Sequence, residues 1–131
     1  MDTRYDFSDQ CGIVTGPASG IGKATALHLD QLGFEVFAGV RKEADREALK
    51  EEGSDRLTPI ILDVTDEETI AAAVNTVAKA TARGVFSLIN NAGLSLNGPL
   101  ELVPVADMRQ LLDVNVLGVL ATTKAFLPML R

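Results

Sequence analysis

Four short, nearly continuous apolar segments divide the chain and predict four β-strands. They span residues 11–14, 35–40, 57–62 and 86–90. Apolar runs that do not alternate with polar residues are typical of parallel strands covered on both faces. We therefore expect a parallel sheet buried between helices.

The segments between the first three strands have helical periodicity. The first helix is expected over residues 19–32, and Gly33 follows where a left-handed cap would end it. The second helix, over residues 42–52, is mostly charged and stops at Gly53, so we expect a solvated outer helix. The apolar stripe predicted for the first helix consists of Ile21, Ala24, His28 and Leu32.

The third helix has the clearest start signal in the sequence. Thr65 followed by Glu68 fits a capping box, in which a hydroxyl and a carboxylate pair with free backbone N–H groups of the first turn. Arg83 and Gly84 mark the end of this helical stretch. Its predicted apolar face consists of Ile70, Ala73, Val74 and Val77.

After the fourth strand, a loop over residues 93–99 leads into helical sequence over residues 105–127, which Gly118 and Pro128 can bend or end. Strands and helices thus alternate, which favours βαβ units with right-handed crossovers. We predict one α/β domain over residues 1–131, a partial Rossmann-type, doubly wound parallel sheet with strand order 3-2-1-4 flanked by helices. The fourth strand would form a bare edge, so we expect self-association.

Charge and composition narrow the classes of partner. The net charge of -6 and the pI near 4.7 disfavour binding to nucleic acid or to an anionic membrane. No apolar run is long enough to cross a bilayer, and residues 1–8 lack the apolar core of a signal peptide, so we expect a cytoplasmic protein.

Cys11 is the only cysteine in the sequence, which excludes an internal disulfide and a cysteine-rich metal site. We expect Cys11 to be a small core residue, and we expect no metal site.

A glycine-rich turn joins the first expected strand to the first helix. Gly16, Gly20 and Gly22 lie in the stretch TGPASGIG with the spacing G-x-x-x-G-x-G. Glycines in such a turn allow a sharp bend, close approach of a pyrophosphate and close packing of helix on sheet, while the helix N-terminus offers free N–H groups to the anion. A tight turn that binds nothing is an equal alternative for these residues alone.

Three further motifs follow the glycine turn: LDVT at residues 62–65, NNAG at 90–93 and VNVLG at 114–118. Together, the four motifs make the chain resemble the short-chain dehydrogenases/reductases of standard length. The longer stretches NNAGLSLNGPLE at residues 90–101 and VNVLGVLATTKAFLPMLR at residues 114–131 resemble the branch that acts on hydroxysteroids, retinoids and other alcohols or ketones. The resemblance implies an NAD(P)-dependent oxidoreductase that transfers hydride between the nicotinamide cofactor and an alcohol or ketone. It also implies a homo-oligomer.

The same resemblance implies a role for each motif residue. The three glycines would line the pyrophosphate, with contacts from Ser19 and Ile21. Asp63 would accept a hydrogen bond from the adenine amino group beside the Val64 amide, with a turn or capping aspartate before the third helix as the alternative. Asn115 would hold a water of the proton relay, with a tolerated polar residue as the alternative; its mid-helix side chain needs a compensating partner. The residues implied to wall the cofactor and to stabilise the sheet are Asn90, Asn91, Ala92 and Gly93.

The choice between NAD and NADP depends on the end of the second strand. An acidic residue there binds the ribose 2′-hydroxyl of NAD, whereas an arginine accommodates the 2′-phosphate of NADP. No carboxylate precedes Glu43, and Arg41 with Lys42 favours NADP. Ser19 argues the other way, because many NADP-preferring relatives carry a basic residue there. We expect NADP, with NAD as the alternative for the cofactor and a merely solvated side chain as the alternative for Arg41.

The catalytic set of the family is absent from this sequence. In the family, a Tyr-x-x-x-Lys pair with a preceding serine exchanges a proton with the substrate while hydride moves. The one tyrosine, Tyr5, precedes the first strand, and the residue four positions later is Asp9. His28 is expected to be a packing or surface residue. We therefore expect the inactive, cofactor-binding half of a longer enzyme; the alternatives are a catalytically inactive dinucleotide-binding module and a ligand-free structural fragment.

Overall fold

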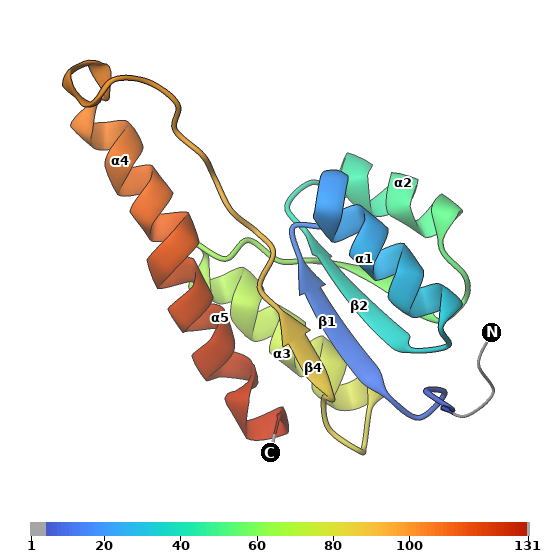
Figure 1. Cartoon of the computed structure of the whole chain (residues 1–131). Helices are drawn as coiled ribbons and strands as arrows, with labels where there is room; N and C mark the ends of the chain where they lie inside the picture. Colours follow the sequence, from blue (N-terminus) through green and yellow to red (C-terminus); the bar gives the residue numbers. More distant parts are fainter. Residues whose placement is uncertain (1–4, 131) are drawn as a thin grey trace.

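The computed structural model describes residues 5–130, in which four strands form one sheet with helices on both faces (Figure 1). The strand order is β3-β2-β1-β4, and all three pairings are parallel. This confirms the predicted topology, the first half of a doubly wound sheet. The strands are β1 (Cys11–Thr15), β2 (Glu35–Val40), β3 (Leu57–Ile61) and β4 (Ser87–Ile89).

The helices divide between the two faces of the sheet. One face carries α1 (Gly20–Gln31) and α2 (Glu43–Glu52), and the other carries α3 (Glu67–Ala80) and a long C-terminal helix (Figure 1). The C-terminal helix consists of α4 (Val105–Leu112), a π-helical segment (Asp113–Gly118) and α5 (Val119–Phe126), and short 3-10 turns lie at Leu100–Leu102 and Leu127–Met129.

Each face of the sheet has its own apolar core. Ile13 and Phe37 face α3 and Phe126 of α5, whereas the alternate strand residues, such as Val14, face α1 and α2. Because both faces are covered, β1 and β2 are apolar at nearly every position, as predicted. Cys11 is 2% exposed, and burial raises the pKa of its thiol to about 12, with Glu35 adding to the rise, so it remains a protonated core residue.

The apolar stripe predicted for α1 is wrong. The face of α1 turned to the sheet carries Gly22 and Ala26, whose small size allows close packing of helix on sheet. It also carries Asp30, whose carboxylate accepts hydrogen bonds from Ser54 N at 2.8 Å and Ser54 Oγ at 2.5 Å. A buried carboxylate with two donors is not visible in a hydrophobicity pattern. Of the predicted stripe, Ile21, Ala24 and His28 are exposed and Leu32 is half-buried.

The capping box predicted for α3 is also wrong. The N-cap is Asp66, whose carboxylate accepts from Glu68 N at 2.9 Å. Thr65 lies one residue before the N-cap, and its hydroxyl donates to Asp63 Oδ1 at 2.7 Å instead. The apolar face of α3 is confirmed, since Ile70, Ala73 and Val77 are buried and Val74 packs against the same core. Gly33, with φ of 97°, ends α1 in the predicted left-handed conformation.

The C-terminal helix continues through Gly118 rather than ending there. A Cβ on Gly118 would lie 2.6 Å from Val64 Cγ2, so glycine is required for the close approach of the helix to the turn after β3. The helix widens over DVNVLG into the π-helical segment, which the sequence pattern did not predict. Pro128 lies in the 3-10 turn that ends the helix.

The same helix corrects the expectation that no segment is long enough to cross a bilayer. Its 25 residues, Val105–Met129, include an 18-residue window with a mean hydropathy of 1.3, of which 17% is buried. By length and composition alone, this helix is able to span a membrane. Its innermost side chains, Thr122 and Phe126, are fully buried on the α3 side of the sheet.

Replacing Thr122 with valine is expected to stabilise the protein by about 1 kcal/mol. The Thr122 hydroxyl is buried and has no hydrogen-bond partner among the described residues, whereas valine has the same shape without the polar group. Urea unfolding of the wild type and the variant measures the difference. Thr76→Val is the matched control, because that hydroxyl is exposed on α3, and its unfolding midpoint should hardly move. A less stable Thr122→Val protein would contradict the prediction.

Candidate functional site

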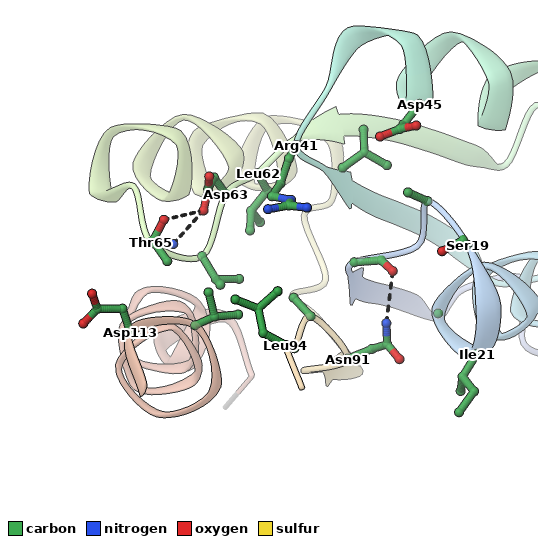
Figure 2. A pocket seen from close by; sticks show the side chains of 18 of the residues that line it. Ser19, Ile21, Arg41, Asp45, Leu62, Asp63, Thr65, Asn91, Leu94 and Asp113 are labelled. Atoms are coloured by element: carbon green, nitrogen blue, oxygen red, sulfur yellow. Dashed lines mark hydrogen bonds between the residues drawn. The ribbon is translucent and has the colours of Figure 1, made fainter. Parts of the chain in front are cut away.

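A cavity of about 540 Å³ opens at the carboxyl ends of the strands, where open α/β sheets bind their ligands (Figure 2). Its walls come from the glycine turn, the end of β2, the turn after β3, the NNAG loop and the C-terminal helix. No group of three His, Cys, Asp or Glu side chains within residues 5–130 could hold a metal ion. The lining residues are Gly16, Ala18, Ser19, Ile21, Gly22, Val40, Arg41, Asp45, Leu62, Asp63, Val64, Thr65, Asn91, Ala92, Gly93, Leu94, Gln110, Asp113 and Val114.

Each glycine of the turn meets a different steric demand. Gly16 and Gly20 have φ of 69° and 58°, the left-handed conformation that side chains rarely adopt. A Cβ on Gly16 would lie 2.8 Å from Ala92 Cα, and one on Gly22 would lie 2.5 Å from Gly16 O and collide with the Asn91 amide. At Gly20, a Cβ would meet nothing within 4 Å, so this glycine faces open space. The turn therefore packs tightly against the NNAG loop and stays open on its outer side.

No side chain of α1 compensates the partial positive charge at the N-terminus of this described helix. Its N-cap, Ser19, makes no side-chain capping hydrogen bond, and the first turn of this described helix carries no acidic residue. The first helical bond observed joins Lys23 N to Ser19 O at 3.3 Å, so the N–H groups of residues 20–22 have no acceptor within the helix. Free N–H groups and an uncompensated helix dipole suit an anionic ligand.

The NNAG loop is fastened to the end of β1 by a hydrogen-bond network. Thr15 Oγ1 accepts from Asn91 N and Ala92 N, both at 3.0 Å. The Asn91 amide nitrogen donates to Thr15 O and Gly16 O, both at 3.1 Å. Figure 2 shows Asn91 below the glycine turn with one of these bonds drawn. The expectation that the motif is partly structural is therefore correct.

Asn90 does not line the cavity, in contrast to its predicted part in walling the cofactor. Its side-chain nitrogen donates to Thr123 Oγ1 at 3.1 Å, on α5. The physical reason is strand geometry, since successive side chains after β4 point to opposite faces of the sheet. Asn90 thus links the sheet to the C-terminal helix, while Asn91, Ala92 and Gly93 reach the cavity.

Asp63 does not cap α3, but it combines a turn role with a place in the cavity lining, which the sequence left as alternatives. Its Oδ1 accepts from Thr65 N at 2.9 Å and Thr65 Oγ1 at 2.7 Å (Figure 2). Thr69 Oγ1 accepts from Asp63 N at 3.0 Å and also lies 3.0 Å from Asp63 O, which fixes the backbone of this residue. No hydrogen bond to Asp63 Oδ2 is found within the described chain. That oxygen is available at the cavity wall beside Val64.

Asn115 has the compensating partner that its mid-helix position requires. Its Oδ1 accepts from Leu94 N and its side-chain nitrogen donates to Leu94 O, both at 2.8 Å. This pair of bonds anchors the loop after NNAG on the π-helical segment, a distortion that is frequent at functional sites. Leu94, but not Asn115, lines the cavity, so the water-holding role of Asn115 stays a prediction.

The wall at the end of β2 holds Arg41, as predicted, and Asp45, which the sequence analysis missed (Figure 2). The predicted Lys42 does not line the cavity. Asp45 lies one helical turn beyond the strand end, a spacing that could have identified it. Gln110 and Asp113 were also missed, because nothing local shows that the C-terminal helix crosses the mouth of the cavity.

Comparison with known proteins identifies relatives over almost the whole chain. The sequence model of the short chain dehydrogenase family matches residues 10–131. Retinol dehydrogenase 16 of Homo sapiens is 42% identical over 125 residues, which cover 94% of this chain and 39% of that protein. Estradiol 17-beta-dehydrogenase 2 of Mus musculus is 42% identical over 125 residues, covering 91% of this chain and 32% of that protein. The chain thus spans less than half the length of these relatives.

Solved structures show the same fold. The 3-ketoacyl-(acyl-carrier-protein) reductase of Brucella melitensis, complexed with NADH, superposes with a TM-score of 0.87 at 27% identity, covering 95% of this chain and 51% of that one. A short-chain dehydrogenase of Streptomyces avermitilis superposes with a TM-score of 0.84 at 34% identity, covering 93% of this chain and 44% of that one. On the family match, the fold and the motif geometry together, this chain belongs to the short-chain dehydrogenase family.

Proposed function

We propose that the cavity binds a nicotinamide dinucleotide and that the whole protein transfers hydride between this cofactor and an alcohol or ketone. The observation that carries the proposal is the uncapped N-terminus of α1 behind the glycine turn, with open space at Gly20. It offers free N–H groups and positive potential at one wall of a cavity large enough for a cofactor. Family membership supports the same assignment.

Different parts of the cavity wall suit different parts of a dinucleotide. The turn with Gly16, Gly20 and Gly22 suits the pyrophosphate, and the free Asp63 oxygen beside the Val64 amide suits the amino group and ring nitrogen of adenine. The NNAG loop and Leu94 form the remaining wall, toward the expected nicotinamide end. The cofactor, when bound, supplies the hydride or accepts it.

The substrate class is proposed from the relatives, among them a retinol dehydrogenase and an estradiol dehydrogenase. We propose an apolar alcohol or ketone of the retinoid or steroid kind. This 131-residue sequence holds no Tyr-x-x-x-Lys pair, so hydride transfer is assigned to the whole protein rather than to this region. A dinucleotide-binding module without hydride transfer is the second candidate, and only assays of the whole protein with such substrates separate the two.

For the cofactor, we propose that NADP is preferred, because Arg41 lies on the cavity wall at the end of β2, where an arginine accommodates a 2′-phosphate. Titration calorimetry of the chain with NADPH and NADH tests both the site and the preference. We expect one dinucleotide per chain with tighter binding of NADPH, and Arg41→Gln should weaken NADPH more than NADH. Lys42→Gln is the matched control, since Lys42 lies outside the cavity lining. Absence of heat with either dinucleotide would contradict the proposed site.

Replacing Thr69 with valine is expected to weaken adenine recognition. The Asp63 N–H would lose its acceptor, so the backbone that positions this carboxylate would lose an anchor, and only the bonds from Thr65 would remain. The measurement compares NADH with reduced nicotinamide hypoxanthine dinucleotide, which lacks the adenine amino group. The wild type should prefer NADH, and Thr69→Val should lose most of that preference, while Thr69→Ser keeps it. Equal preference in the wild type and Thr69→Val would contradict the positioning role of Thr69.

Self-association is proposed from the outer edge of β4, which pairs with no strand among residues 5–130, and from the exposed apolar side chains of the C-terminal helix. Leu112, Val116 and Leu120 are 46%, 54% and 55% exposed. Light scattering after size-exclusion chromatography should give a mass above the 13.9 kDa of one chain. Leu120→Glu should shift the mass toward the monomer. A stable wild-type monomer would contradict this prediction.

A further inference from the structure

The inner face of α2 carries a carboxylate that is directed to the cavity. Asp45 is half-buried, whereas the other charged residues of α2 are exposed. It lies one helical turn before Leu49, which is 2% exposed in the core on that side of the sheet. Leu49 therefore holds the face of α2 that bears Asp45 against the sheet, over the end of β2.

Asp45 and Arg41 both line the cavity, from the segment that runs from the end of β2 into α2, and Figure 2 shows the Arg41 guanidinium turned toward Leu62. Arg41 is the one cation among the described lining residues, and the other lining carboxylates, Asp63 and Asp113, come from the turn after β3 and from the C-terminal helix. Asp45 is thus the lining carboxylate that comes from the same segment of the chain as Arg41, four residues further on. Within the described chain, it makes no ion pair and no side-chain hydrogen bond.

The neighbouring carboxylate of the first turn of α2 is in a different situation. Glu43 is exposed, does not line the cavity and pairs with Arg46 Nη1 at 3.3 Å. Its charge is therefore partly neutralised and faces solvent. Glu43 is thus paired and faces solvent, whereas Asp45, two residues later, is unpaired within the described chain and lines the cavity. Glu43 therefore serves as a matched control for Asp45.

These observations bear on the ribose 2′-position of the proposed cofactor. The 2′-phosphate of NADP carries nearly two negative charges at neutral pH, whereas the 2′-hydroxyl of NAD is neutral and can donate a hydrogen bond to a carboxylate. A carboxylate on the lining of the same cavity repels the phosphate that Arg41 attracts, and it leaves binding of the neutral ribose intact or improves it.

We propose that Asp45 is a specificity-determining residue that opposes Arg41 and limits the preference of this site for NADP over NAD. The inference rests on the proposed function, since it concerns the same cavity. The site then discriminates by the balance of one cation and one anion that come from the same segment of the cavity lining, and removing the anion shifts the balance toward NADP.

The test compares the affinities of NADPH and NADH for the wild type, Asp45→Asn, Asp45→Glu and Glu43→Gln by titration calorimetry at low ionic strength. Asp45→Asn should raise the NADPH-to-NADH affinity ratio about fivefold, an effect that added salt reduces. Asp45→Glu retains the charge and should stay near the wild-type ratio. Glu43→Gln removes the same charge from the same helical turn and should also leave the ratio unchanged. Thermal unfolding of each variant verifies that the fold is kept.

The outcomes distinguish a failure of this inference from a failure of the proposed function. If both dinucleotides bind and Asp45→Asn leaves the ratio unchanged, or if Glu43→Gln raises it equally, the inference is wrong and the proposed site stands. If neither the wild type nor any of the variants binds NADPH or NADH, the proposed function and the inference are both overturned.

Discussion

Replacing Gly22 with alanine is expected to destabilise the protein by about 3 kcal/mol and to weaken dinucleotide binding more than tenfold. The new Cβ would lie 2.5 Å from Gly16 O and would collide with the Asn91 amide, so the backbone of the turn has to move. Because the same turn is proposed to hold the pyrophosphate, stability and affinity fall together. Urea unfolding and calorimetric titration with NADPH measure the two effects.

Gly93→Ala is the matched control for this change. A Cβ on Gly93 would have Asn115 Oδ1 at 3.4 Å and Asn91 O at 3.8 Å as its nearest neighbours, which are ordinary contacts. Its unfolding free energy should stay within about 0.5 kcal/mol of the wild type. A Gly22→Ala protein with wild-type stability and affinity would show that the close approach of the turn to Asn91 is not required.

The second large effect is expected at Thr15, the residue that fastens the NNAG loop. In Thr15→Val, the N–H groups of Asn91 and Ala92 lose their shared acceptor in a site that is 1% exposed at Thr15. Two unpaired N–H groups cost about 3 kcal/mol in unfolding free energy. Thr15→Ser keeps the oxygen and should cost about 1 kcal/mol, for the lost methyl group. If Thr15→Val and Thr15→Ser lose equal amounts of unfolding free energy, the Thr15 hydroxyl contributes no more to stability than the Thr15 methyl group.

The strand order was predictable because each step depends on local sequence. Continuous apolar runs such as 35–40 indicate strands covered on both faces, and the intervening helices require parallel pairing. What the pattern missed depends on partners distant in sequence. The true inner face of α1 is stabilised by hydrogen bonds that Ser54 donates to Asp30, and the π-helical segment lies where Asn115 binds Leu94. Hydrophobic periodicity carries no information about such polar pairs.

The site was predictable where one residue type meets a steric or chemical demand that few others meet. Gly16 and Gly20 adopt left-handed conformations, and Asp63 stands at a strand end that opens to the cavity. Asn90 lies outside the cavity lining, because a short motif does not reveal which of two adjacent asparagines faces the cavity, and its part in cofactor binding stays a prediction. Asp45 was missed because a charged helix suggests solvent exposure throughout.

An amide-resolved NMR titration of the 15N-labelled chain with NADPH tests the central claim most directly. Specific binding at the glycine turn and the adenine subsite should shift the backbone amide signals of residues 20–22, Val64 and Ala92 in a saturable manner. The opposite end of the sheet, around residues 83–86, should remain unchanged. Absence of saturable shifts, or shifts confined to residues 83–86, would contradict the assignment of this cavity as a dinucleotide site.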